Sequence, residues 1–196
     1  MTTLPQAIKD RSKLLPEGGM LTAKEFLHLG SRAAVDQAFS RLAKSGLLLR
    51  VTRGLYVAPK AGQHGREAPA AEKVVSSLAS KTQEVIAADG AQSAKLLGLP
   101  TQGAVGDVFL TSGRARTLKV GGVTVELRHA PKWMLSLGTS TAGSVIRALA
   151  WLGEAHVGQV VVKLRENLST ADWQALSSAR YLLPSWMAQA IGREVV

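Results

Sequence analysis

Apolar side chains near the start of the chain recur at helical spacing. Ile8 and Leu14 predict a first helix of about ten residues, which Pro16 and the glycines after it end. Thr22 stands where an N-cap is needed for a second, short helix over residues 23–29. The chain is therefore expected to begin with two helices, followed by a glycine-containing turn.

A third helix is predicted over residues 32–44. Val35 and Phe39 belong to an apolar stripe on one face of this segment, and the opposite face is polar. Ser31 is the expected N-cap, and Gly46 follows the last helical residues, where a glycine commonly ends a helix.

Two β-rich runs, residues 47–52 and 55–59, follow this helix. Arg53 and Gly54 stand between them, which is typical of a two-residue hairpin turn. Helix, helix, turn, helix and basic hairpin is the order of elements in a winged helix-turn-helix. We therefore predict this DNA-binding fold, three helices plus a β-hairpin wing, over residues 1–60.

The composition changes at residues 61–69, which are rich in Gly and Pro and hold no apolar side chain larger than Ala, as in a linker. Residues 70–196 are expected to form a larger α+β C-terminal domain. Helices are predicted near residues 70–80 and 90–99. The short strands predicted after them cover residues 108–111, 117–120 and 123–129, and the later helices cover residues 142–153, 160–168, 170–179 and 186–191.

Four tryptophans fall in this second part of the chain. They are Trp133, Trp151, Trp173 and Trp186. Trp151 lies in an apolar helical run and is expected in the core, whereas Trp186, beside Pro184, is the better candidate for a surface anchor.

The net charge of +10 is concentrated in the first third of the chain. Residues 1–66 hold eleven Lys or Arg against four Asp or Glu, and the remaining residues hold thirteen against ten. A localised basic surface favours binding to a polyanion, because neutralised phosphates release their counterions. A basic run is also common on ordinary solvated faces. The charge therefore supports the winged helix-turn-helix predicted from the order of elements, but it does not predict DNA binding by itself.

The polar face of the predicted third helix supplies the candidate base contacts. Arg32 can pair with guanine and Gln37 with adenine, while the Ala33 methyl suits a thymine methyl. Ser31 and the helix N-terminus suit a phosphate. Asp36 fits this face least well, because a carboxylate repels phosphate unless it accepts from a cytosine amino group or orients an arginine.

Further along this helix, Ser40, Arg41 and Lys44 are expected to complete the DNA-binding face, with Arg41 and Lys44 on the phosphate backbone. Arg50 and Arg53 are expected on or beside the wing. Each position alone also fits a solvated helix face, but the set as a whole favours operator DNA.

Motifs for catalysis and metal binding are missing from the sequence. There is no Cys, the four His show no metal-ligand spacing, and neither a paired Asp motif after Gly-Ser nor a phosphate-binding loop occurs. We therefore expect no enzyme activity, no metal and no cofactor. The sequence also lacks a signal peptide and a long apolar span, so a cytoplasmic protein is expected.

The run GSRAAVDQAFSRLAKSGLLLRVTRGLYVAP, at residues 30–59, resembles the N-terminal signature of the type IV abortive-infection antitoxins, the AbiEi-like proteins. The segments AADGAQSAKLLGLPTQ, DVFLTSGRARTLKVGG, VELRHAP, VIRALAWLG and LPSWM resemble the rest of that family, in order. The resemblance implies a winged-helix repressor that binds inverted repeats in the promoter of its own operon. It also implies a C-terminal domain that counteracts a nucleotidyltransferase toxin encoded next to it. The alternative is a stand-alone winged-helix transcriptional regulator whose C-terminal domain is a protein-interaction module.

Overall fold

The computed structural model describes residues 3–101 and 106–194, and its fold is α+β. The chain divides into two compact units. Unit 1 comprises Met1–Glu84 and Arg116–Glu126, and unit 2 comprises Val85–Ala115 and Leu127–Val196.

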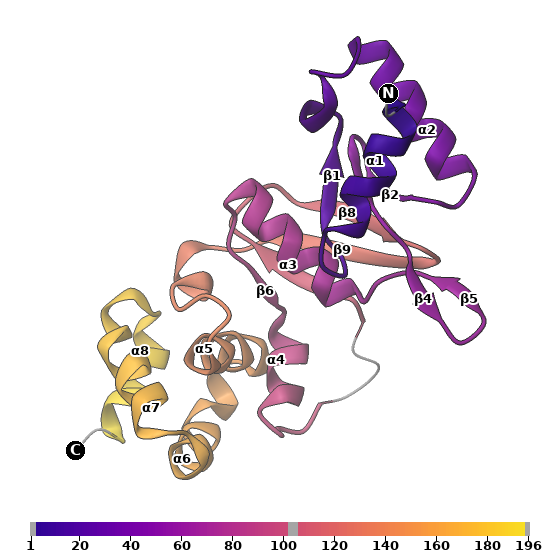
Figure 1. Cartoon of the computed structure of the whole chain (residues 1–196). Helices are drawn as coiled ribbons and strands as arrows, with labels where there is room; N and C mark the ends of the chain where they lie inside the picture. Colours follow the sequence, from indigo (N-terminus) through magenta and orange to yellow (C-terminus); the bar gives the residue numbers. More distant parts are fainter. Residues whose placement is uncertain (1–2, 102–105, 195–196) are drawn as a thin grey trace. The chain divides into compact units, whose positions relative to one another are not determined.

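Unit 1 holds most of the short strands of the chain (Figure 1). Its elements are α1 (Leu4–Lys13), β1 (Met20–Thr22), the 3₁₀ turn η1 (Ala23–Phe26), α2 (Arg32–Lys44), β2 (Leu49–Thr52), β3 (Leu55–Val57), β4 (Lys60–Gly62), β5 (Gly65–Glu67), α3 (Ala71–Thr82), β8 (Arg116–Val120) and the start of β9 (Val123–His129).

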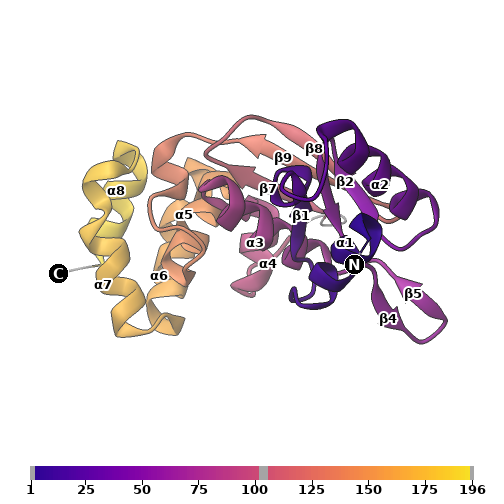
Figure 2. The ribbon, with the colours of Figure 1, turned by 45° about the horizontal axis from the view of Figure 1, so that its top comes forward.

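Unit 2 contains most of the helices of the second half of the chain (Figures 1 and 2). Its elements are β6 (Ile86–Ala88), α4 (Gly90–Leu96), β7 (Val108–Thr111), the end of β9, η2 (Lys132–Leu135), α5 (Thr141–Leu152), η3 (Glu154–His156), α6 (Val157–Asn167), α7 (Thr170–Ser178), η4 (Arg180–Leu182) and α8 (Ser185–Arg193).

A three-stranded antiparallel sheet with the order β1-β3-β2 supports the first two helices of unit 1. Leu21 of β1 and Tyr56 of β3 share one buried core with Ile8 of α1. The ring of Phe39, on α2, lies 5.6 Å from the ring of Phe26 and 4.7 Å from that of Tyr56. These aromatic contacts fix α2 against η1 and the sheet, as edge-on and tilted ring pairs do in other cores.

The opposite face of this small sheet is also covered. Met20 and Val57 are register partners on the face away from Leu21, and both are buried. Helix α3 lies against β1, and β8 lies beside β2. The sheet is therefore buried on both faces within unit 1 and separates two apolar layers.

Three sequence predictions for this unit are confirmed, and a fourth is only partly correct. The first helix, the helix over residues 32–44 and the hairpin β2–β3, with Arg53 and Gly54 at its turn, form as expected. The expected helix over residues 23–29 is a single 3₁₀ turn, η1. Because Leu27 and Leu29 are exposed, no apolar burial supports continuation of that turn into an α-helix.

Residues 61–69 are not a structureless linker, in contrast to the prediction. Strands β4 and β5 pair in a second hairpin in which Gly62 faces Gly65. The division into compact units also differs from a boundary at this segment, because α3 and β8 belong with the first sixty residues. Their apolar side chains, among them Leu78 and Leu118, are buried in unit 1.

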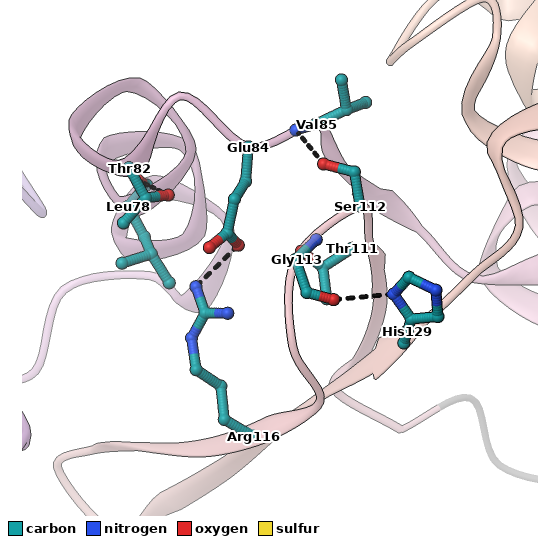
Figure 3. A network of polar contacts seen from close by, with 9 residues as sticks. All are labelled: Leu78, Thr82, Glu84, Val85, Thr111, Ser112, Gly113, Arg116 and His129. Atoms are coloured by element: carbon teal, nitrogen blue, oxygen red, sulfur yellow. Dashed lines mark hydrogen bonds and ion pairs between the residues drawn. The ribbon is translucent and has the colours of Figure 1, made fainter.

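In unit 1, β8 pairs with the start of β9, and Nη2 of Arg116 lies 2.8 Å from Oε2 of Glu84, which ties β8 to the residues after α3 (Figure 3). In unit 2, β7 lies between β6 and the end of β9, and Oγ of Ser112 accepts from the backbone N–H of Val85 at 3.0 Å.

Helix α5 forms the centre of unit 2. Its residues from Ala142 to Leu149 are buried, and α4, α7 and η2 lie against it. Arg147 is also buried there and donates to the carbonyl oxygen of Gly138 at 2.7 Å and to Oγ of Ser144 at 3.2 Å. A polar side chain therefore occupies part of a core that is otherwise apolar.

The expectations for two tryptophans were wrong. Trp151 is 42% exposed, because it lies beyond the fully buried part of α5, near the end of that helix. Trp186 is partly buried against the main core of unit 2, so it does not stand out as a surface anchor. Trp173 is buried, and the guanidinium carbon of Arg165 lies 5.1 Å from the centre of its ring.

Among the described residues, no single helix is long and apolar enough to span a membrane. The bent pair formed by Thr141–Leu152 and Glu154–Asn167, with 111° between the two parts, passes the same test of length and composition.

Candidate nucleic-acid interface

Helix α2 is the best-defined element of the candidate interface. Ser31 is its N-cap, and the Ser31 Oγ accepts from the backbone N–H of Ala34 at 3.3 Å. Gly46 follows the C-cap with a φ of +69°, a conformation that favours glycine. Both ends of α2 are therefore determined by local sequence, as expected.

The exposed face of α2 is polar and basic. Successive residues turn by about 100°, so Ala33, Gln37, Ser40 and Lys44 form its central stripe. Arg41 lies along one edge of the stripe. All of these side chains are exposed, while Val35, Ala38, Phe39 and Leu42 are buried on the other side.

Arg32 and Asp36 form an ion pair along the other edge of this stripe. The Nε of Arg32 lies 3.0 Å from Oδ2 and 3.2 Å from Oδ1 of Asp36. Both side chains are more than half exposed. Asp36, the carboxylate expected to fit this face least well, is thus in contact with an arginine. Orienting an arginine is one of the two roles that would make a carboxylate on this face compatible with DNA binding.

The hairpin β2–β3 carries the other two candidate residues. Arg50 is exposed and is the register partner of Tyr56, so it lies on the face of the sheet that packs against α2. Arg53 is exposed in the two-residue turn, and Gly54 beside it has a φ of +78°. The turn is short, and its arginine extends into solvent.

All nine predicted residues are exposed and belong to unit 1, seven at or along α2 and two on the hairpin. They are Ser31, Arg32, Ala33, Gln37, Ser40, Arg41, Lys44, Arg50 and Arg53.

A second basic surface in unit 1 was not predicted. A hollow of about 400 Å³ is lined by Lys9, Lys13, Lys60 and Arg66, together with Glu17. Oε1 of Glu17 lies 3.4 Å from Nζ of Lys60 and accepts from the backbone N–H of Ala70. The hairpin β4–β5 supplies two of these cations, and they were missed because its sequence has the composition of a linker.

One hydrogen bond joins this second hairpin to the end of α2. Nη1 of Arg66, on β5, donates to the carbonyl oxygen of Gly46 at 3.4 Å. The glycines at 62 and 65, on either side of a two-residue turn, are the sequence signal that could have revealed the hairpin.

Within the described residues, no group of three or more His, Asp or Glu side chains is arranged to hold a metal ion. No curated protein matches the chain. The crystal structure of RV2827C protein from Mycobacterium tuberculosis is similar to it, with 14% sequence identity and a TM-score of 0.47, over 96% of this chain and 80% of that chain. Residues 7–173 match the family described as "Family of unknown function (DUF6088)". Because this match covers most of the sequence, the chain belongs to that family.

Proposed function

We propose that unit 1 contains a winged helix-turn-helix that binds double-stranded operator DNA. The observation that carries the proposal is the order of elements α1, β1, η1, α2, β2, β3 with the sheet order β1-β3-β2. In this arrangement η1 and α2 correspond to the helix-turn-helix, and the β2–β3 turn to the wing. The exposed polar face of α2 supports the same assignment, because a recognition helix presents such a face to the major groove.

In the proposed complex, α2 enters the major groove with its N-terminal end against the bases. Arg32, Ala33 and Gln37 read base edges, because residues in the first turns of a recognition helix reach deepest into the groove. Ser31 and the unpaired N–H groups beside it bind a phosphate. The remaining candidates, namely Ser40, Arg41, Lys44, Arg50 and Arg53, position the helix on the DNA backbone.

The biological role that we propose rests on the sequence resemblance to type IV abortive-infection antitoxins. The chain represses its own operon from inverted repeats in the promoter and counteracts a nucleotidyltransferase toxin. The chain acts in the cytoplasm by binding, without catalysis and without a metal or cofactor.

A second candidate function is a stand-alone transcriptional regulator in which unit 2 binds another protein. Exposed apolar side chains on unit 2 favour it, since Tyr181 is 84% exposed and Leu182 and Trp151 are each more than two-fifths exposed. Exposed aromatic residues are enriched where proteins bind each other. Both candidates share the DNA-binding role of α2.

Selection of duplexes from a random pool by the full-length chain tests the shared role. We expect one enriched motif, and we expect a footprint over the same motif in the region upstream of the gene. Arg32→Ala and Gln37→Ala should each weaken binding to the selected duplex by about 5- to 150-fold. Lys163→Ala, which removes an exposed cation of α6 in unit 2, is the control and should leave the affinity unchanged. No enriched motif, or equal affinity of all four proteins, would contradict the proposal.

Co-expression separates the two candidate roles. The adjacent gene is expressed with and without this chain, and bacterial growth is measured. Growth arrest by the neighbour, relieved by this chain, supports the antitoxin. A neighbour that is not a nucleotidyltransferase and has no effect on growth supports the stand-alone regulator.

A further inference from the structure

We infer that Asp36 holds the Arg32 guanidinium in the orientation that reads guanine and thereby gives α2 its sequence selectivity. The inference rests on the proposed DNA-binding function and deepens it, because it assigns a G·C base pair to a specific pair of side chains. Asp36 acts through Arg32 and is a positioning residue.

The geometry of the ion pair leaves the reading edge of Arg32 available. Both carboxylate oxygens of Asp36 accept from the Nε of Arg32, at 3.0 and 3.2 Å. Within the described part of the chain, neither Nη1 nor Nη2 of Arg32 has a hydrogen-bonding partner. These two nitrogens carry the parallel N–H groups that match O6 and N7 of guanine. Asp36 therefore anchors one side of the guanidinium and leaves the opposite side for the base.

Helix stability does not favour this order of the two charges. Arg32 is the first residue of α2, and the first turn holds no acidic residue. A cation at that end is unfavourable, since the N-terminus of a helix carries a partial positive charge. An i,i+4 pair is also less stabilising with the cation on the N-terminal side than with the anion there. The opposite order of charges would stabilise α2 more, so helix stability does not explain why the arginine stands first.

The charge of Asp36 also has opposite effects on two classes of DNA. On any duplex the carboxylate repels the phosphates, so it weakens binding that depends on charge alone. On a duplex with guanine at the right position, it keeps Arg32 in place and lowers the entropic cost of fixing a long side chain. Asp36 should therefore lower affinity for random DNA and raise affinity for the selected sequence.

Titrations of the full-length chain with two duplexes of equal length test this inference. One duplex carries the selected motif and the other a scrambled sequence, and fluorescence anisotropy gives both dissociation constants at the same salt concentration. Asp36→Ala should weaken the selected complex about fivefold or more and tighten the scrambled one about two- to fivefold, so that their affinity ratio falls by about tenfold or more. Asp36→Glu should restore part of the ratio, because a longer carboxylate still reaches Nε.

Two controls exclude a simple effect of charge. Asp10→Ala removes an exposed carboxylate from α1 in the same unit and should leave the ratio unchanged. In an Arg32→Ala background, Asp36→Ala should no longer lower the ratio, since a positioning residue has no effect without the side chain that it positions.

The outcomes separate the inference from the proposed function. If Asp36→Ala tightens both duplexes by the same factor, or lowers the ratio equally without Arg32, the inference is overturned and the DNA-binding role stands. If the unaltered chain binds the two duplexes equally, the proposed operator binding fails and the inference fails with it.

Discussion

The buried Arg147 is an unusual residue for the centre of an apolar core. It is 1% exposed, and burial lowers its pKa to about 10, so it is still charged at neutral pH. No carboxylate among the described residues pairs with it. Its guanidinium instead donates to Gly138, Ser144 and Ser93. These bonds join the loop before α5 to α4 through one side chain.

Replacing Arg147 by lysine should destabilise unit 2. The ammonium of Arg147→Lys keeps the charge but cannot reach three acceptors in three directions, so buried oxygens lose their donors at a cost of about 1–3 kcal/mol. Urea denaturation measures this change in the free energy of unfolding. Arg193→Lys, at the end of α8, is the control and should lie within experimental error of the unaltered chain.

Glu25 links η1 to α3 and should make unit 1 sensitive to acid. Burial by itself raises its pKa, but hydrogen bonds from Lys81 and Thr22 outweigh burial and hold the pKa below the ordinary value of 4.5. A carboxyl group whose pKa is lower in the folded state stabilises the protein above its ordinary pKa. It loses that contribution as the pH falls through the lowered value.

Glu25→Gln should therefore lower the free energy of unfolding by about 1 kcal/mol near neutral pH and by almost nothing in strong acid. The estimate is small because both partners of the ion pair are partly exposed. Urea midpoints measured across the acid range give the difference curve. A difference that stays constant with pH, or one that Glu166→Gln on α6 reproduces, would show that the Lys81 ion pair is not its cause.

At the scale of elements, the contact between α4 and α5 depends on Gly90. A Cβ built on this residue would clash with the Cβ of Trp151 and lie 2.8 Å from the carbonyl oxygen of Arg147. Backbone must therefore move before any larger residue fits. This close approach also explains the position of Trp151, whose first side-chain carbons cover Gly90.

Gly90→Ala should destabilise the chain by about 2 kcal/mol or more, measured as a shift in the thermal or urea midpoint. Gly158→Ala provides the matched comparison, because nothing lies within 4 Å of its Cβ position on α6. Removal of a helical glycine there should stabilise slightly, by about 0.5 kcal/mol. Equal effects of the two substitutions would mean that helix propensity, and not the close contact, decides the result.

The elements differ in how far local sequence determines them. For α2, the N-cap at Ser31, the apolar stripe and Gly46 all indicate the same boundaries, so its extent and its exposed face were predictable. The hairpin over residues 60–67 is only weakly indicated by its sequence, because neither strand buries an apolar side chain and the two glycines at its turn are also typical of a linker. Backbone pairing and the bond from Arg66 to Gly46 hold it in place, and composition does not reveal either.

At the scale of the whole molecule, the unpredictable feature is which distant segments complete the first unit. Part of the sheet β1-β3-β2 could be predicted from the hairpin β2–β3. The segments that cover the second face of this sheet could not be predicted. That cover comes from α3 and from β8, and β8 begins at residue 116. Local periodicity shows that Met20 and Val57 are apolar, but it does not show which later segment buries them.

Amide hydrogen exchange of the full chain tests this composition of unit 1. If α3 and β8 complete the unit, amides of β1, β3, α3 and β8 should open together, with one common free energy of exchange. Amides of the exposed hairpin β4–β5 should exchange much faster and serve as an internal reference.

If residues 1–60 instead formed a domain joined by a linker, β1 and β3 would open independently of α3 and β8. In that case a fragment of residues 1–66 would be as stable as the same residues in the full chain. The burial of Met20 and Val57 instead predicts that this fragment unfolds more easily than the full chain, because it exposes apolar surface.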